Sequence, residues 1–330
     1  MKNLSDGKDD FYLNSSLNDH AQNNPLVYVV ILNWNNAEDT LECLESLQAT
    51  DYRPYFPIVV DNGSTDGSVD KIRSAFPDVH QIELDSNLGY AAGNNSGIKY
   101  ALEAGADYVL VLNNDTLVEK GMLRKLVAFA KTNDNIGMLG PKMYCFQPED
   151  TIFALGSFVD WSKGETSNRG MFMPASEIEF PIKSEPVDFI AGCCVLVSRK
   201  MLEKVGFLDP MYYLNYEDVD WGIRAQRKGF EVWFTPDAVL WHKVSATMGQ
   251  ASPINTYYMT RNALLFFWKN SPSQYRWMAI AQIIFRTLRT IGAWTVRPKY
   301  WNESYRNLRA ANLLALRDFT RGNFGQMQGR

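Results

Sequence analysis

The chain has 330 residues, of which 46% are hydrophobic and 21% are charged, so it can bury a sizeable core and is not disordered throughout. Its formal net charge of −4 argues against a nucleic-acid-binding protein, and its four cysteines are too few for a disulfide framework. Uncharged stretches fall short of the roughly 18–20 residues that a membrane-spanning helix needs. We therefore expect a globular protein of the reducing cytoplasm.

Charge is unevenly distributed along the chain. Residues 261–330 contain twelve Lys and Arg but two Asp and Glu, whereas the preceding residues contain 21 basic and 35 acidic side chains. Residues 1–24 are polar and lack the apolar run of a secretory signal, so we expect a disordered tail there. We predict a globular domain over residues 25–249 and a basic, amphipathic helical extension over residues 250–330.

The first third of the chain alternates between apolar, β-branched runs and helical patterns. This alternation predicts an α/β fold with a mainly parallel sheet flanked by helices. Strands are expected at residues 26–32, 57–60, 79–84, 107–112, 187–197, 231–234 and 239–241. Helices are expected at residues 41–47, 68–76, 94–104, 199–205 and 215–228, and they dominate from residue 257 onward. The turn-rich segment 145–186 predicts short strands or loops over the sheet.

Three polar clusters follow strands of the predicted sheet, at residues 33–35, 61–64 and 113–115. Ligands of open α/β sheets bind outside the carboxyl ends of the strands. Asn, Asp and Gly also form ordinary turns, but three clusters at one edge favour a binding site. A G-x-G-x-x-G loop after the first strand and a P-loop are both missing, which disfavours a Rossmann dehydrogenase and a P-loop kinase. Asp115 ends an apolar run, where a carboxylate can bind Mg²⁺ or Mn²⁺ beside a phosphate.

Six motifs follow one another along the chain: VILNWN at 30–35, VVDNGSTD at 59–66, NLGYAAGNN at 87–95, LNNDT at 112–116, YEDVDWGIR at 216–224 and VLWH at 239–242. Their sequences, order and spacing resemble the family 2 inverting glycosyltransferases, and in particular the rhamnosyltransferase-like group. The resemblance covers roughly residues 26–245 and implies a GT-A fold, a nucleoside-diphosphate-sugar donor and a divalent metal, Mg²⁺ or Mn²⁺.

The resemblance assigns one set of residues to the donor. Asp61 matches the acid that contacts the base of the nucleotide, and Asn33 and Asn35 lie on the loop that flanks it. The loop beside the nucleotide and sugar corresponds to Asn87, Gly89 and Asn94. Asn114 is the middle residue of the motif that ends the fourth strand, and we place it with the donor-binding residues.

A second set is assigned to the metal. Asp115 matches the metal-binding aspartate of the family's D-x-D motif, but Asn113 stands in the first position, which leaves one carboxylate there. His242 matches a histidine that completes the metal site in some relatives. From the residue alone, a packed histidine beside Trp241 is an equally good interpretation.

The adjacent acids Glu217 and Asp218 match the acceptor-side acidic motif of the family. Transfer to a sugar hydroxyl needs a base that takes its proton, and we predict Asp218 in this role with Glu217 as the supporting acid. Acids at a helix start also act simply by favourable interaction with the helix dipole. We expect Asp220 to be structural or to face the acceptor, and Arg224 to pair with an acid.

The predicted function is transfer of a sugar, with rhamnose as a candidate, from a dTDP- or UDP-sugar to a glycan or lipid-linked acceptor in surface polysaccharide synthesis. A nucleotidyltransferase is an alternative, but it needs a basic loop after the first strand, and residues 33–39 contain no Lys or Arg. A catalytically weak nucleotide-sugar-binding or assembly subunit is a second alternative, which the reduced motif Asn113–Asp115 leaves open.

The C-terminal extension interleaves tryptophans with arginines, including Trp277, Trp301, Arg289 and Arg297. Basic amphipathic helices with aromatic residues bind anionic membrane surfaces, so we predict peripheral contact with the inner face of the plasma membrane. A cap on the catalytic domain and a contact between copies in a homo-oligomer are the alternatives. RNA binding is disfavoured because the sequence contains no known nucleic-acid-binding module.

Overall fold

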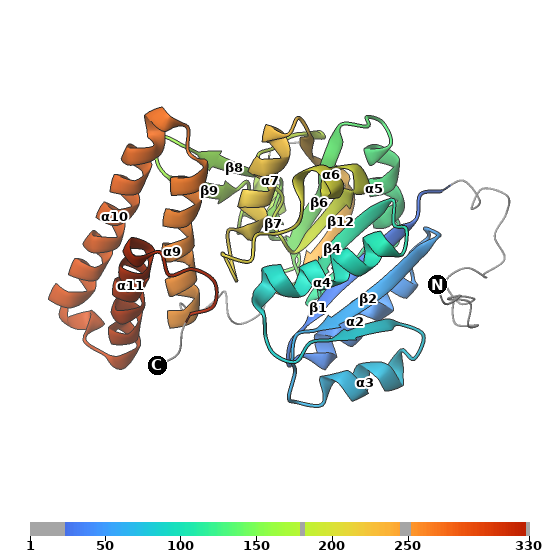
Figure 1. The fold of residues 1–330 in the computed structure, drawn as a ribbon, viewed down its shortest axis with the longest axis horizontal. Coiled ribbons are helices and arrows are strands. Elements are labelled where there is room, and N and C mark those ends of the chain that lie inside the picture. The colour runs from blue at the N-terminus through green and yellow to red at the C-terminus, as the bar shows by residue number, and fades with distance from the viewer. Residues whose placement is uncertain (1–23, 179–181, 245–251, 328–330) are drawn as a thin grey trace.

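The computed structural model describes residues 24–178, 182–244 and 252–327, so the predicted tail lies outside the described residues except for Asn24. At its centre is a mixed, mainly parallel sheet flanked by helices (Figure 1), which confirms the predicted fold class. In spatial order its strands are β10 (Glu185–Pro186), β12 (Glu231–His242), β6 (Ile136–Cys145), β11 (Cys194–Ser198), β4 (Tyr108–Asn113), β1 (Val27–Asn33), β2 (Tyr55–Asp61) and β3 (His80–Glu83). The short strands β5 (Thr116–Val118) and β7 (Ile152–Ala154) pair with β12 and β6.

The strands β3, β2, β1 and β4 run parallel and end at a common edge. In this register Asn33 lies opposite Asp61, and Leu32 lies opposite Asn113. The predicted polar clusters are therefore neighbours at the carboxyl edge of the sheet. The connecting helices, all expected from the sequence, are α2 (Ala37–Gln48), α3 (Ser68–Ala75) and α4 (Gly89–Glu103).

The other half of the sheet departs from the expectations. β11 runs antiparallel to β4 and β6, and it begins at Cys194 instead of residue 187. The two strands expected at 231–234 and 239–241 form one strand, β12, whose register shifts between Thr235 and Val239. Pro236 lies inside this shift, and a proline cannot donate a ladder hydrogen bond.

Three further elements have no counterpart among those expected, namely the short strand β5, the strand β6 and the helix α5 (Met122–Ala130). β6 contains Gly137, Gly140 and Pro141, residues that normally indicate a turn and that conceal its strand pattern. Gly140 is required because a Cβ there would lie 2.4 Å from Cγ2 of Ile190. Packing against the segment before β11 therefore overrides the local propensity of this strand.

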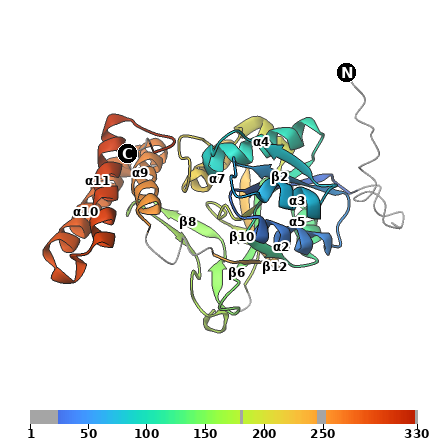
Figure 2. The same ribbon diagram turned by 90° about the horizontal axis from the view of Figure 1, so that it is seen from below.

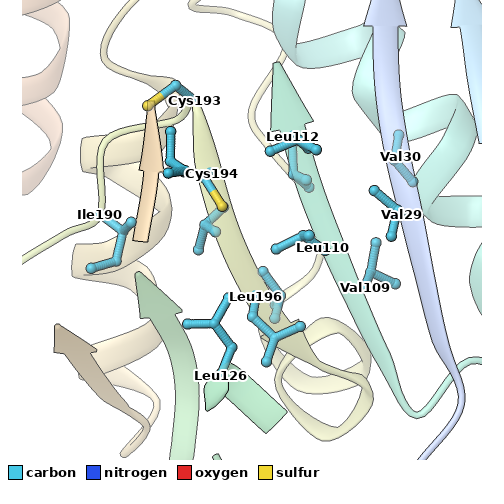
Figure 3. Close-up of a cluster of buried hydrophobic side chains, with 14 of the residues drawn as sticks. Val29, Val30, Val109, Leu110, Leu112, Leu126, Ile190, Cys193, Cys194 and Leu196 are labelled. Atoms are coloured by element: carbon cyan, nitrogen blue, oxygen red, sulfur yellow. The ribbon is translucent and has the colours of Figure 1, made fainter. Parts of the chain in front are cut away.

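The main core fills the space between the sheet and its helices. Figure 3 shows apolar side chains of β1, β4 and β11 packed together, with Leu126 of α5 against them. Cys193 and Cys194 are free thiols buried at one end of this cluster, where they pack with the apolar side chains. Each fully buried aliphatic side chain contributes about 1.5–3 kcal/mol, so this core holds the strand ends in fixed positions.

Helices cover both faces of the sheet. Figure 2 shows α4 and α2 on opposite sides of it. α4 packs closely because of Gly97, where a Cβ would lie 2.5 Å from Cγ1 of Val30 and 2.9 Å from Cγ2 of Val60. On the other half of the sheet, α6 (Arg199–Val205) contacts β6 and β11, and α7 (Glu217–Arg227) contacts β6 and β12.

Three helices end the described chain: α9 (Pro253–Asn270), α10 (Ser273–Val296) and α11 (Glu303–Arg321). Figures 1 and 2 show α9 between the sheet and the other two helices. The hairpin of β8 (Ser157–Asp160) and β9 (Glu165–Asn168) packs against α10, where Arg286 donates hydrogen bonds to the carbonyls of Lys163 and Gly164. The 3-10 turns are η2 (Ala175–Glu177) and η3 (Pro298–Tyr300). None of the helices in the described ranges is both long and apolar enough to cross a bilayer.

Candidate active site

Asn33 and Asp61 form a buried hydrogen-bonded pair where β1 and β2 end. Nδ2 of Asn33 donates to Oδ2 of Asp61 at 2.8 Å, and the backbone N–H of Ser64 donates to Oδ1 of Asp61 at the same distance. Asn33 is 0% exposed and Asp61 is 2% exposed. Buried polar groups need such partners, so both side chains are held rigidly at the edge of the sheet.

The same network includes Asn114 and Asn35. Oγ1 of Thr40 donates to Oδ1 of Asn33 at 2.8 Å and accepts from Nδ2 of Asn114 at 3.0 Å. Asn35 has a left-handed backbone with a φ of 51°, and its Oδ1 accepts from the N–H of Thr65 at 2.8 Å. The fold thus joins four of the predicted donor-binding residues in one hydrogen-bonded edge: Asn33, Asn35, Asp61 and Asn114.

Asn87 and Gly89 lie at the start of α4. Oδ1 of Asn87 accepts from the N–H of Gly89 at 2.8 Å, from Nδ2 of Asn62 at 3.1 Å and from the hydroxyl of Tyr213 at 3.2 Å. Gly89 has a φ of +84°, and a Cβ there would lie 2.5 Å from the ring of Tyr213. Only glycine satisfies both constraints, which accounts for this residue of the motif.

Asn94 differs from the other predicted donor residues because it lies inside α4. It is 0% exposed, and its Nδ2 donates to the carbonyl of Tyr90 at 3.0 Å. Its Oδ1 is buried without a hydrogen-bond partner among the described residues. Tyr90 in turn donates its hydroxyl to the carbonyl of Gly192 at 2.6 Å, which links α4 to the segment before β11.

Asp115 and His242 are remote in sequence and meet at the sheet edge. Oδ1 of Asp115 lies 3.1 Å from Nε2 of His242, and the two residues are 7% and 6% exposed. The backbone N–H of Lys243 donates to the carbonyl of Asp115 at 2.8 Å, which fixes β12 beside the end of β4. Nδ1 of His242 is buried without a partner in the part of the chain that the structure describes.

The donor chemistry of this pair fits a divalent cation. Octahedral ligands at about 2.0–2.1 Å from Mg²⁺ lie about 3 Å from one another, which matches the 3.1 Å between Asp115 and His242. Carboxylate oxygen and imidazole nitrogen are also acceptable to Mn²⁺. Within residues 24–178, 182–244 and 252–327, no group of three or more His, Cys, Asp and Glu could hold an ion. Further ligands would therefore come from phosphate and water, as is common for these ions.

Glu217 and Asp218 open α7 in two different environments. Oδ2 of Asp218 accepts from the N–H of Gly192 at 2.9 Å, and its Oδ1 accepts from the N–H of Val219 at 2.8 Å. Burial raises the pKa of Asp218, and these hydrogen bonds oppose the effect. Glu217 is 4% exposed, its Oε2 has no partner among the described residues, and burial with the charge of Asp218 holds its pKa well above its usual range. This arrangement favours a protonated Glu217 beside an ionised Asp218.

Cys193 connects the two acidic positions. Burial, its neighbour Cys194 and the charges of Asp115 and Asp218 all raise the pKa of the Cys193 thiol. The preceding residue, Gly192, donates its backbone N–H to Oδ2 of Asp218 at 2.9 Å. The N–H of Asn113 also donates to the carbonyl of Cys193 at 2.9 Å. The two acidic positions therefore flank one short segment of the chain.

Asp220 has structural partners on three elements. It is 0% exposed and accepts hydrogen bonds from Nε of Arg224 at 2.6 Å, from the hydroxyl of Tyr212 at 3.0 Å and from Nδ2 of Asn270 at 2.9 Å. The ion pair confirms that Arg224 pairs with an acid. Asp220 thus ties α7 to α9 and is the structural member of the acidic motif.

Five residues of this edge received no role from the sequence: Thr40, Asn62, Tyr90, Gly192 and Tyr213. Asn62 and Tyr90 lie inside two of the motifs, so the motif pattern did contain a signal for them. The others lie outside every motif and join the site through tertiary contacts. No local sequence pattern identifies such residues.

Comparison with known proteins identifies the class. The sequence profile described as "Glycosyl transferase family 2" matches residues 28–206. The chain belongs to this family and is a glycosyltransferase, which confirms the resemblance inferred from the motifs. The matched region contains the motifs at 30–35, 59–66, 87–95 and 112–116, and it ends before Glu217.

The relatives include named rhamnosyltransferases. A dTDP-rhamnosyl transferase, RfbF of Shigella flexneri, is 26% identical over 275 residues, covering 81% of this chain and 88% of that protein. An N-acetylglucosaminyl-diphospho-decaprenol L-rhamnosyltransferase of Mycobacterium tuberculosis is 30% identical over 229 residues, covering 62% of this chain and 72% of that protein.

Solved structures share the fold at low sequence identity. The mannosyltransferase PcManGT from Pyrobaculum calidifontis, in complex with GDP-Man and Mn2+, aligns with a TM-score of 0.55 at 16% identity, covering 95% of this chain and 92% of that chain. TarS 1–349 of S. aureus, in complex with UDP, aligns with a TM-score of 0.54 at 15% identity, covering 90% and 82%. These neighbours are GT-A glycosyltransferases, in agreement with the predicted fold.

Proposed function

We propose that this glycosyltransferase moves a sugar, with rhamnose as the favoured candidate, from a dTDP- or UDP-sugar to a hydroxyl of a glycan or lipid-linked acceptor in surface polysaccharide synthesis. The names of the two rhamnosyltransferase relatives support the sugar and a role in glycan assembly. The observation that carries the proposal is structural. The segment Gly192–Cys193 is hydrogen-bonded to Asp218 on one side and to Asn113, two residues before Asp115, on the other, so a donor and a base can meet there.

The reaction is a single displacement with inversion. Asp218 takes the proton of the acceptor hydroxyl, whose oxygen forms a bond to the anomeric carbon from the face opposite the diphosphate. The bond from that carbon to the diphosphate oxygen breaks, and the nucleoside diphosphate leaves with the electron pair. The backbone N–H groups of Gly192 and Val219 orient the carboxylate of Asp218, and a protonated Glu217 avoids a second charge beside it.

Asp115 and His242 would hold Mn²⁺ or Mg²⁺ in this reaction. Such a cation, when bound, neutralises charge that develops on the departing diphosphate. The 3.1 Å separation of the two ligand atoms and their burial support this assignment.

The residues that we propose to bind the donor are those of the hydrogen-bonded carboxyl edge of the sheet and of the start of α4. Asp61, Asn33 and Asn35 would meet the nucleoside, and Asn114 would lie between them and the diphosphate. Asn87, Gly89 and the more deeply buried Asn94 would line the nucleotide and sugar from α4. A small, preorganised set of polar groups of this kind is typical of a nucleotide site.

The test is a thermal-shift panel of dTDP-, UDP- and GDP-sugars with and without Mn²⁺. One nucleoside-diphosphate sugar should raise the melting temperature. At a hundredfold excess over its Kd, the bound sugar adds about 2.7 kcal/mol to the free energy of unfolding. Asp115→Asn and His242→Ala should remove the part of the shift that requires Mn²⁺. The exposed Asp78→Asn is the matched control and should leave it intact. A flat panel with the wild-type chain would overturn the proposal.

Product analysis separates the alternatives. Asp218→Asn should lower transfer about 10²–10⁴-fold, the typical contribution of a general base, while the donor-induced shift persists. Donor binding without any product in the wild type would instead assign the chain as a binding subunit. Release of pyrophosphate would assign a nucleotidyltransferase.

We also propose that α10 contacts an anionic membrane surface, at the inner face of the plasma membrane where a lipid-linked acceptor would be found. The sequence of α10 contains three arginines and no acid. Large apolar side chains on this region are strongly exposed, with Trp277 at 70%, Phe285 at 65% and Val296 at 75%. An apolar face combined with positive charge favours binding at the interface of anionic lipids.

Vesicle pelleting with the full chain tests this contact. The wild type should pellet with phosphatidylglycerol-containing vesicles and remain in solution with pure phosphatidylcholine. Phe285→Ser and Arg289→Glu should each reduce pelleting, whereas the exposed Lys131→Glu, outside the C-terminal helices, should behave as the wild type. Equal partitioning of all variants would contradict the proposal. Self-association that Phe285→Ser abolishes, without lipid binding, would assign the surface to a second copy.

A further inference from the structure

The loop before the general base has an unfavourable backbone. Tyr213, Asn215 and Tyr216 have φ values of 66°, 66° and 75°, in the left-handed region that favours glycine. Each such residue costs on the order of 1–2 kcal/mol, so surrounding contacts must hold the loop in place. Tyr216 is also the N-cap residue of α7 and makes no capping hydrogen bond with its side chain. The loop leads directly into Glu217 and Asp218.

A single side chain of α9 holds most of this loop. Nδ2 of Asn262 donates to the carbonyls of Tyr212 and Leu214 at 2.8 Å and to that of Asn215 at 2.9 Å. Asn262 is 0% exposed, and it binds the carbonyls of one buried residue, Tyr212, and of two half-buried residues, Leu214 and Asn215. Three carbonyls that converge on one amide define the curvature of the loop.

Arg261 orients that amide. Nε and Nη2 of Arg261 donate to Oδ1 of Asn262 at 2.9 and 2.8 Å, which leaves the NH₂ group of Asn262 facing the loop. Nη2 also donates to the carbonyl of Tyr212 at 3.1 Å, and the guanidinium lies 4.9 Å from the centre of the Tyr258 ring. Arg261 is 0% exposed, and burying a charge is costly unless it makes such a set of contacts.

The loop also contacts the donor side of the site. The backbone carbonyl of Tyr213 accepts a hydrogen bond from the N–H of Tyr90 at 2.7 Å. The side-chain hydroxyl of Tyr213 donates a hydrogen bond to Oδ1 of Asn87. The base end and the donor end of the site are thus both attached to the segment that Asn262 holds.

We propose that Asn262, oriented by Arg261, is a positioning residue for Asp218, and that α9 is an integral part of the catalytic unit. This inference rests on the proposed role of Asp218 as the base. Asn262 does not touch the reacting atoms. It acts by fixing residues 212–215, which set where α7 begins and so where the carboxylate of Asp218 points.

The variant Asn262→Asp tests the amide without changing the shape of the side chain. It keeps the oxygen that accepts from Arg261 and places a second oxygen against the three carbonyls, so the donated hydrogen bonds are lost. We expect kcat to fall about tenfold to hundredfold, the size of effect that a displacement of about 1 Å produces. The acidic limb of the pH–rate profile should move, and kcat should change by a larger factor than donor KM.

Thr260→Val is the matched control on the same helix. Its hydroxyl donates to Oδ1 of Asn312 on α11 at 2.7 Å, so its loss weakens helix packing without touching the loop. This variant should lose some thermal stability and keep the kcat and pH profile of the wild type. If Asn262→Asp also loses only stability, with kcat and pH profile unchanged, the proposal is overturned.

Hydrogen exchange gives a readout that does not depend on activity. In Asn262→Asp, peptides covering residues 211–219 should exchange faster, whereas in Thr260→Val they should exchange at the wild-type rate. Unchanged exchange in Asn262→Asp would overturn the positioning role even if the enzyme proved inactive. If Asp218→Asn kept the wild-type kcat, Asp218 would not be the base and the proposed function would be contradicted. The exchange result for Asn262→Asp would be unaffected, so the two failures can be told apart.

A milder variant covers the case in which Asn262→Asp does not fold. Asn255 on α9 accepts a hydrogen bond from Nδ2 of Asn215 at 2.9 Å and is only half-buried. Asn255→Ala should change kcat and loop exchange in the same direction by a smaller factor. No change in either quantity would count against the proposal.

Discussion

At the scale of single residues, two adjacent carboxyl groups acquire different chemistry from their surroundings. Asp218 has two backbone N–H donors, whereas Glu217 has a buried oxygen without a partner among the described residues. Burial raises the pKa of the neighbouring Tyr90, and the acidic groups around it raise this pKa further. Paired acids whose surroundings separate their pKa values are typical of acid–base sites.

The first prediction concerns the pH dependence of activity. Asp218 must be ionised to accept a proton, and burial raises its pKa above the usual 3.8. Activity should therefore be lost, as the pH falls, at a higher pH than an ordinary aspartate would give. A pH–rate profile with saturating donor measures this midpoint. A midpoint at or below 3.8 would contradict the assignment.

The second prediction concerns Glu217 and stability. Its folded-state pKa lies well above the usual 4.5, so over the range between the two pKa values the folded protein keeps a proton that the unfolded chain has already released. The corresponding stability is present below the unfolded pKa and is lost as the pH rises through the folded pKa. Glu217→Gln removes this loss, so it should raise the melting temperature at pH 8 relative to wild type by more than at pH 4. An equal difference at both pH values would exclude this mechanism.

At the scale of elements, the contact between α4 and the sheet is set by a glycine. Gly97→Ala places a Cβ 2.5 Å from Val30 and 2.9 Å from Val60, both in the sheet core. Overpacking of this kind costs about 1–3 kcal/mol, which exceeds the gain in helix propensity. Denaturant unfolding should show this loss.

Ser96→Ala, on the same helix, is the control for this prediction. Its hydroxyl donates only to the carbonyl of Ala92 within α4, at 3.3 Å. We expect a change within about 0.5 kcal/mol. A Gly97→Ala protein as stable as the control would mean that α4 does not pack at this distance.

Whether a strand could be predicted from the sequence depended on how continuous its apolar pattern is. β1, β2 and β4 are covered on both faces and show as continuous apolar runs, so they could be predicted. β6 contains two glycines and a proline, and its strand conformation depends on neighbours that lie far away in sequence. β12 was expected as two pieces because Pro236 interrupts its pattern.

At the scale of the whole molecule, the C-terminal helices divide into two roles. α9 shares a hydrophobic cluster with Phe189, Tyr212 and Val219 of the catalytic body. In α10, Ala279, Ile280 and Ile283 are the buried residues, whereas Trp277, Phe285 and Val296 are strongly exposed. The boundary predicted at residue 249 remains a prediction, but the packing of α9 argues that this helix belongs with the body.

The last prediction follows from the packing of α9 against the rest of the protein. A chain that ends at residue 249 loses Leu264, Phe266 and Phe267, each 0% exposed. Each such side chain contributes about 1.5–3 kcal/mol, and their sum approaches the total stability of a typical domain. We expect the shortened chain to lose cooperative thermal unfolding and transferase activity. Unfolding near the full-length melting temperature, with activity retained, would show that the body is independent of α9.

The sequence by itself determined the family, the α/β alternation and the polar residues at the strand ends, because local patterns and motif order encode them directly. Tertiary structure alone decided that Asp115 meets His242, that Glu217 and Asp218 differ in environment, and that Asn262 reaches the loop before α7. The physical reason is distance along the chain. Burial and hydrogen bonding between residues far apart in sequence exist only after the chain has folded, and no local pattern reports them.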